Sequence, residues 1–550
     1  MKANFRQSMS WLHTWAGLVL GWLLFAVFLT GTIAYFRQEV TLWMQPELHG
    51  SVPSPRAAEL GLAKLAEVAP DASSWTVNLP ADRNETLRVS WRKAASRGGA
   101  ERDAGRGGGR GDGLILDAST GEVLKPRATE GGNFLYRFHF ELHAMPRAWA
   151  RTLVGIATLV MFIAIISGII THRRFFMDFF TFRPSKGQRS WLDAHNVTAV
   201  LALPFHVMIT YSGLLLVAAN LLPWSSQVIF GDNPRAAMAA SRAAEQKEAE
   251  ALKAELAKLG GGTSVPIPKL MAEAEREWGQ PVSRITVSEP GKPGSIVELL
   301  PTRNDSLILE SGSGGLGGVK LAFVAKTGER LSPPAPRAGS FVGGLQASLG
   351  SLHRARFASV GLRWVFFLAG VCGTLMIATG LVLWSVKRAE KRKGAPGTLG
   401  HRLVDHLNVG AVAGLSVAVA AYFWANRLLP VDLASRGDRE IQVFFAVWAL
   451  TFLQPLARPL RRAWLEQLGA AGLLFVAIPV LNALTTDSHL GVTIPAGKWL
   501  IAGFDIVAFV TGLAMLHAAR KVWRRRQPVA PVASRPSPSA PPAAAVAVES

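Results

Sequence analysis

Long apolar segments, interrupted by two long polar stretches, dominate the pattern of the chain. Segments of this kind cross a membrane when they span about 30 Å of hydrocarbon. Those that qualify are residues 11–36, 150–171, 195–222, 360–385, 404–429, 441–457, 465–484 and 497–518. The pattern therefore predicts a polytopic α-helical membrane protein with about eight transmembrane helices and two domains outside the membrane.

The two polar stretches repeat the same order of elements. In the first, an amphipathic helix at Arg56–Val68 precedes the alternating strand WTVNL, and the stretch ends in LILDASTGEVL. In the second, a helix at Ile267–Trp278 precedes SRITVSE and SIVELLP, and the stretch ends in LAFVAKTGERL. The shared Thr-Gly-Glu predicts a turn between two strands. We interpret the chain as an internal duplication in which each copy is a helix pair around one α+β domain.

The basic residues predict the orientation in the membrane. The formal net charge is +21, and lysines and arginines cluster directly after apolar segments, as at Arg173–Arg174, Lys387–Lys393 and Arg520–Arg526. This placement is typical of cytoplasmic helix ends and argues against a nucleic-acid partner. Both termini are then cytoplasmic, in the inner membrane of a bacterium, and both polar stretches are periplasmic if the cell is Gram-negative.

These assignments give the expected boundaries. They are 1–36 for the first helix, 37–149 and 223–359 for the two periplasmic domains, 150–222 for helices two and three with their cytoplasmic loop, 360–385 for helix four, 404–518 for helices five to eight, and 519–550 for a disordered cytoplasmic tail.

Histidines near the predicted membrane edges are the candidate chemistry. His13 and His195 occupy equivalent positions at the cytoplasmic starts of helices one and three, and His143 and His353 precede helices two and four at the other face. Neutral imidazole is a good axial ligand, and two ligands from facing helices hold one haem iron. We therefore predict two b-type haems, one between His13 and His195 and one between His143 and His353. Alternatively, such histidines simply reach the lipid headgroups.

Three further histidines leave the assignment open. His139 lies one turn before His143 on the same helix face, His172 closes helix two, and His206 lies within helix three, eleven residues after His195 and on the same side of an unbroken helix. His206 could equally form a hydrogen bond to Tyr211 or to a neighbouring helix. The single cysteine, Cys372, excludes an intrachain disulfide and a thiolate-ligated cluster.

Longer motifs resemble those of a known family. They are WLHTWAGLVLGWLLFAVFLTGTIAYF, ELHAMPRAWARTLVGIATLVMFIAIISGIITHRR, WLDAHNVTAVLALPFHVMITYSGL and the segment from LHRARF to GTLMIATGLVLW, together with the two TGE-tailed domains. The chain resembles bacterial PepSY-associated transmembrane-helix proteins over about residues 8–390. The resemblance implies periplasmic PepSY domains, and His13, His143, His195 and His353 match the family's helix-start histidines. Some relatives resemble haem-containing ferric-siderophore reductases.

The resemblance favours an oxidoreductase that passes electrons through two haems to a periplasmic ferric siderophore. Some relatives carry a fused flavodoxin or flavin reductase domain, whereas residues after 390 offer no nucleotide-binding fingerprint. The electron donor is therefore a quinol or a separate cytoplasmic reductase. Two alternatives stay open: a non-enzymatic, membrane-anchored PepSY binding or regulatory protein, and a component of an iron or siderophore transporter.

Overall fold

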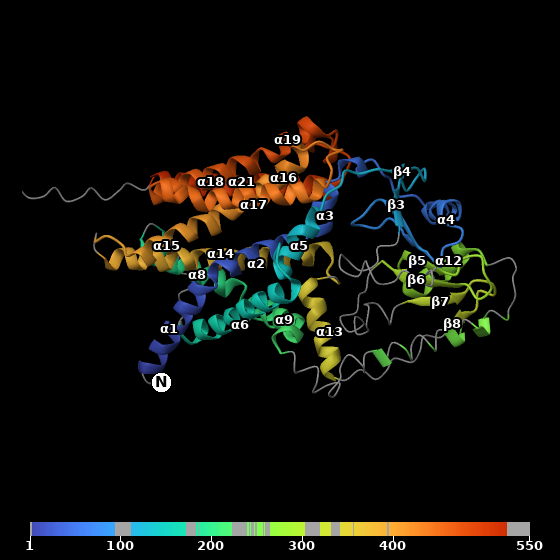
Figure 1. Cartoon of the computed structure of the whole chain (residues 1–550), viewed down its shortest axis with the longest axis horizontal. Coiled ribbons are helices and arrows are strands. Elements are labelled where there is room, and N and C mark those ends of the chain that lie inside the picture. Colours follow the sequence, from blue (N-terminus) through green and yellow to red (C-terminus); the bar gives the residue numbers. More distant parts are fainter. Residues whose placement is uncertain are drawn as a thin grey trace, which may run out of the picture.

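The computed structural model consists of a helical part and one antiparallel sheet that lies at one end of the helices (Figure 1). The structure describes residues 3–93, 112–171, 183–184, 186–222, scattered residues between 239 and 258, 265–302, 320–331, 341–355, 357–392 and 395–524. We call the end of the helices next to the sheet the sheet end, and the opposite end the distal end.

Among the described residues, six helices are long and apolar enough to cross a membrane. The number rises to eight if two bent helix pairs each count as one span, so the predicted helical membrane protein is confirmed at this level. The unbent spans are α6 (Arg147–Thr171), α14 (Val360–Lys391), α15 to α16 (Leu399–Leu428), α17 (Arg436–Ala457), α18 to α19 (Leu460–Thr485) and α21 (Trp499–Arg524).

The two bent pairs are the first and third predicted spans. Helices α1 (Ala3–Val19) and α2 (Gly21–Ala34) meet at 66°, and α8 (Gln188–Leu201) and α9 (Leu203–Leu221) meet at 70°. Pro204 explains the second bend, because proline has no N–H to donate and its ring clashes with the preceding turn. The bends lie at Leu20 and Ala202, each seven residues after His13 or His195. The duplication is therefore visible in the helices.

The two polar stretches do not form separate sheets but one sheet of eight strands, in the order β4-β3-β2-β1-β5-β6-β7-β8. Strand β1 pairs antiparallel with β5, with Thr76 opposite Thr286. The order is symmetric about this central pair. The strands are β1 (Ser74–Asn78), β2 (Leu87–Arg92), β3 (Asp112–Leu116), β4 (Val123–Leu124), β5 (Val282–Ser288), β6 (Ile296–Pro301), β7 (Leu321–Val324) and β8 (Arg330–Leu331).

Local elements of the sheet follow the sequence pattern closely. The predicted amphipathic helices are α4 (Ala57–Val68) and α12 (Ile267–Trp278), and residues from both pack into one core with strand residues such as Val77 and Ile285. The two Thr-Gly turns close the hairpins β3-β4 and β7-β8. Gly121 and Gly328 have φ of +77° and +70°, which glycine adopts at little cost.

Shorter helices connect the sheet to the membrane helices. They are α3 (Arg37–Trp43), the 3₁₀ turn η1 (Pro46–Leu48), α5 (Gly131–Glu141) and α13 (Phe341–Arg354). The helices after residue 398, here called the C-terminal helices, also contain the π-helical segment η2 (Val409–Gly414) and the short α20 (Leu490–Thr493). They lie together on one side of the earlier helices (Figure 1). The expected tail at 519–550 begins inside α21, and residues from 525 on lie outside the described residues.

The central strand pairing can be tested by cross-linking in a Cys372→Ala background. Opposite residues of neighbouring antiparallel strands lie within disulfide reach, whereas residues two strands apart do not. Thr76→Cys with Thr286→Cys should therefore form an intramolecular disulfide on mild oxidation, detected by mass spectrometry of the digested protein. Thr76→Cys with Glu298→Cys is the control, because Glu298 pairs with Thr286 on the far side. Efficient cross-linking in the control alone would contradict the strand order.

Candidate functional site: two histidine pairs

The structure brings four histidines together as two pairs. The ring centroids of His13 and His195 lie 6.1 Å apart, with 68° between the ring planes. The ring centroids of His139 and His353 also lie 6.1 Å apart, with 38° between the planes. One pair lies toward the distal end and the other at the sheet end. We call them the distal pair and the sheet-side pair.

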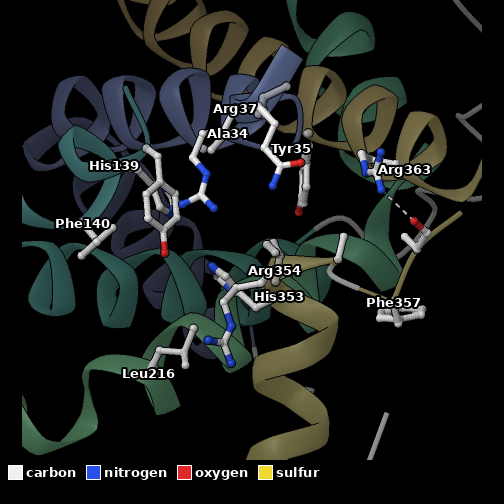
Figure 2. Close-up of a pocket in the computed structure, with 18 of the residues that line it drawn as sticks. Ala34, Tyr35, Arg37, His139, Phe140, Leu216, His353, Arg354, Phe357 and Arg363 are labelled. Carbon is white, nitrogen blue, oxygen red and sulfur yellow. Dashed lines mark hydrogen bonds between the residues drawn. The ribbon is translucent and has the colours of Figure 1, made fainter. Parts of the chain in front are cut away.

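The distal pair is the predicted one, but the sheet-side pair differs from the prediction. His143 was expected opposite His353, and His139 occupies that place instead. Helix α5 ends at Glu141, and Leu142 with φ of +52° turns the chain away. His143 is consequently exposed, and its ring stacks on Phe445 at 5.2 Å. His139, one turn earlier, stays on the helix and faces inward (Figure 2).

Each paired histidine is held through Nδ1 by a neighbouring helix. His13 Nδ1 lies 2.8 Å from the carbonyl oxygen of Ala164, and His195 Nδ1 lies 2.8 Å from that of Met376. His139 Nδ1 lies 2.7 Å from the carbonyl oxygen of Val27. If Nδ1 carries the proton and donates it to the carbonyl, Nε2 is the ring nitrogen that carries the lone pair.

His353 is held in a related way. Its Nδ1 lies 2.9 Å from Ser212 Oγ, and the backbone carbonyl of Ile209 also faces the ring. Burial lowers the pKa of His139, and burial together with the neighbouring His139 lowers the pKa of His353 to about 3. Both rings are therefore neutral, which is the form that binds a metal.

A glycine lies against each of the four rings. In each case the glycine comes four residues after the residue whose backbone carbonyl faces the ring. A Cβ on Gly168 would lie 3.1 Å from the His13 ring, and one on Gly380 would lie 3.1 Å from the His195 ring. The corresponding distances are 3.2 Å from Gly213 to His353 and 2.6 Å from Gly31 to His139. The glycines therefore serve close approach of the histidine rings.

The two pairs open into two cavities. The distal cavity has a volume of about 700 Å³ and mostly apolar walls, with the distal pair and His206 among its lining residues. The sheet-side cavity has a volume of about 890 Å³ and reaches from the sheet-side pair to the ends of β1 and β5. Leu24 and Met161 line both cavities. The two sites are thus separated by a single layer of side chains.

The remaining candidates are placed as follows. His206 is fully buried between the rings of Phe28 and Phe205, and neither of its ring nitrogens has a well-formed hydrogen bond. The expected hydrogen bond to Tyr211 is absent from the described contacts of His206. The expected alignment of His206 with His195 required a straight helix, and the 70° bend between α8 and α9 breaks that helix. His172 lies outside the described residues.

Arginines around the sheet-side pair were not predicted as site residues. Arg37 and Arg354 extend into the same space as His139 and His353, as Figure 2 shows. Arg354 follows His353 directly in the sequence, and this adjacency could have indicated that Arg354 is a site residue. Among the described residues, no group of three or more His, Cys, Asp or Glu side chains could hold a metal ion. A bare ion would therefore find two histidine ligands at each pair.

Comparison with known families assigns most of the chain to one of them. A family described as the PepSY-associated TM region matches residues 10–387, which include all four paired histidines. The chain belongs to this family. The match ends just before the C-terminal helices, so these lie outside the PepSY-associated TM region. No curated protein matches the chain.

The glycines of this PepSY-associated TM region provide a test that needs no cofactor. Gly31→Ala places a Cβ inside the contact distance of His139, and overpacking of this kind costs about 1–3 kcal/mol. We expect a lower thermal unfolding temperature for the purified protein. Gly17→Ala is the control, because a Cβ there meets nothing within 4 Å and alanine favours the helix by about 1 kcal/mol. Equal stability of the two variants would argue against the tight contact.

Proposed function

We propose that the chain is a di-haem electron-transfer protein of the bacterial inner membrane that reduces a ferric siderophore on the periplasmic side. The observation that carries this proposal is the pair of opposed, tethered imidazoles, present twice. A metal–imidazole bond is about 2.0 Å long. Two such bonds and the two half-rings together span about 6 Å, which fits the centroid distance of 6.1 Å at both pairs.

The donor set also suits haem better than a bare metal ion. Each site offers two imidazoles that line the same cavity, and the walls of the distal cavity are mostly apolar. A porphyrin would supply the four equatorial nitrogens that the chain lacks, and haem held in this way supplies one-electron transfer. The hydrogen bonds to Nδ1 orient the rings and raise their basicity.

The order of the sites gives the direction of electron flow. The distal pair lies toward the end where Lys387 and Lys391 are exposed, which the positive-inside rule places in the cytoplasm. A quinol or a separate cytoplasmic reductase would be oxidised there, and each electron would leave at the sheet-side cavity. Addition of one electron converts Fe(III) to Fe(II), which hard oxygen donors hold less well, so that iron is released.

A reduced-minus-oxidised spectrum of the purified protein tests the proposal. We expect Soret and α bands of b-type haem, and about half of the haem should be lost in His13→Ala or in His139→Ala, because each change removes one axial ligand. His143→Ala is the matched control, because it lies one turn from His139 and should keep the full haem content. Absence of haem from the wild-type protein would overturn the proposal.

A further inference from the structure

The sheet-side cavity is strongly basic at the end that faces the sheet. Its described lining contains a single acidic side chain, Asp82. The basic side chains of the lining, apart from histidine, are Arg37, Arg83, Arg151, Arg284, Arg354 and Arg363. They come from both parts of the fold, since Arg284 belongs to β5 and Arg363 to α14. The cavity is therefore positively charged where the sheet meets the helices.

Neighbouring carboxylates of the described residues offset part of this charge. Glu39 accepts two hydrogen bonds of 2.7 Å from Arg83 and lies 3.7 Å from Arg363. Glu141 accepts a hydrogen bond of 2.6 Å from Arg151. Counted among the described residues and with both included, six arginines face three carboxylates. Glu39 and Glu141 are buried, so they also fix the arginines in place rather than leaving them flexible.

Arg284 is the arginine best placed to meet a ligand from the sheet side. Its Nε donates a 2.7 Å hydrogen bond to Asn78 Oδ1, across the central strand pair, and Asn78 lines the same cavity. This bond orients the guanidinium, and its other nitrogens offer further donors. Guanidinium groups bind planar carboxylates and related oxygen anions well.

We infer that the sheet-side cavity selects ferric chelates with net negative charge, such as those with carboxylate or catecholate groups, over neutral hydroxamate chelates. The inference rests on the proposed function and deepens it. Negatively charged oxygens could also come from the propionates of a haem at the sheet-side pair. Arg37 and Arg354, beside the histidines, suit propionates, whereas Arg284 on the sheet suits the incoming chelate.

The test compares two ferric probes on the dithionite-reduced, desalted protein. Fe(III)–EDTA is an anion, and Fe(III) tris(acetohydroxamate) is neutral. We expect Arg284→Gln to slow oxidation by Fe(III)–EDTA by about tenfold at low salt, because charge steering acts on the anion alone, and to leave the neutral probe unchanged. The wild-type rate with Fe(III)–EDTA should also fall as salt is added. Arg276→Gln on the exposed side of α12 is the matched control.

Each result decides a separate point. If Arg284→Gln slows both probes equally, or alters haem content, then the arginine serves the cofactor and the inference is wrong. If the wild-type protein holds no haem, the proposed function fails, and equilibrium dialysis with Fe(III)–EDTA against the neutral chelate still reports the charge preference. Equal binding of the two chelates would overturn the inference by itself.

A second inference comes from the C-terminal helices, which in the described part of the chain form a dense aromatic cluster with α5, one of the two helices that carry the sheet-side pair. Phe134 and Phe138 of α5 point toward these helices. The ring of Phe134 lies 5.1 Å from those of Tyr422 and Phe444, and the ring of Phe138 lies 5.8 Å from that of Phe445. Phe138 directly precedes His139. The aromatic contacts therefore act on the turn of α5 that carries the histidine.

Hydrogen bonds fix the start of the same helix. Tyr422 donates a 2.9 Å hydrogen bond to the carbonyl oxygen of Gly131, and Thr129 donates a 2.5 Å hydrogen bond to Glu440. Arg436 forms an ion pair with Glu440 and donates to the carbonyl oxygen of Ala128 at 3.1 Å. Arg436 and Glu440 are both fully buried. Charges buried in this way keep a definite geometry, because an unpaired partner is costly.

The equivalent helix α13 in the second copy packs on α9, within the duplicated part of the chain. Among the described residues, the aromatic contacts with the C-terminal helices come from α5 and not from α13. We propose that the C-terminal helices are a one-sided brace that positions α5, and hence His139, in the sheet-side pair. Tyr422 and Thr129 are then positioning residues. This also rests on the proposed function, since the position of His139 sets the properties of the cofactor it ligates.

The brace is tested with the double variant Tyr422→Phe and Thr129→Val, which removes three hydrogen bonds at the start of α5 with little change of volume. Of the two low-spin haem signals in the electron paramagnetic resonance spectrum, the one that is lost in His139→Ala should shift, and the other should not. Trp424→Phe is the control, because its indole donates to the carbonyl oxygen of Leu474 within the C-terminal helices.

Unchanged signals, or an equal shift of both, would overturn the brace. Hydrogen exchange of the α5 amides gives a readout that does not need haem. Exchange over residues 131–141 should be faster in the double variant than in Trp424→Phe, even in haem-free protein. A wild-type protein without haem but with this difference would refute the proposed function and leave the brace intact.

Discussion

The fold depends on four half-buried imidazoles that each meet a backbone carbonyl of a neighbouring helix. An imidazole can approach a helix backbone this closely only where the next turn has no side chain, and glycine supplies that space at all four places. The bends in the first and third spans change the helix on which each span packs. Helix α1 packs on α6 and α8 packs on α14, whereas beyond the bends α2 packs on α14 and α9 on α6. Each bent span therefore serves both pairs.

The duplication was readable from the sequence because it repeats local patterns. The helices α4 and α12, the Thr-Gly hairpins and the equivalence of His13 with His195 all follow from short stretches of residues. The choice between His139 and His143 does not. Both lie on one face of an ideal helix, and the helix end at Glu141 with the left-handed Leu142 decides between them. No residue type at these positions predicts that helix end. Leucine rarely adopts a positive φ, so the left-handed conformation of Leu142 could not be expected from the sequence.

The contacts between the two copies could not be predicted from the sequence either. Alternation of apolar and polar residues predicts that β1 and β5 are strands but not which strand lies beside which, because any antiparallel neighbour satisfies the same alternation. The grouping of arginines in the sheet-side cavity could not be predicted for a similar reason. Arg37, Arg284 and Arg363 are far apart in the chain, and only the joined sheet over the helices brings them to one cavity.

The symmetry of the histidines contrasts with the charges around them, and this contrast bears on the proposed electron path. The distal cavity has mostly apolar walls, and its cations, Lys387, Arg388 and Lys391, lie at the end of α14, where water screens them. The arginines of the sheet-side cavity include the buried Arg363, which is screened much less. Nearby positive charge favours the reduced state of a one-electron cofactor, because reduction adds a negative charge. Two sites with the same ligands would therefore differ in reduction potential, the sheet-side one being higher, and electrons would move from the distal end toward the sheet without any difference in the histidines themselves.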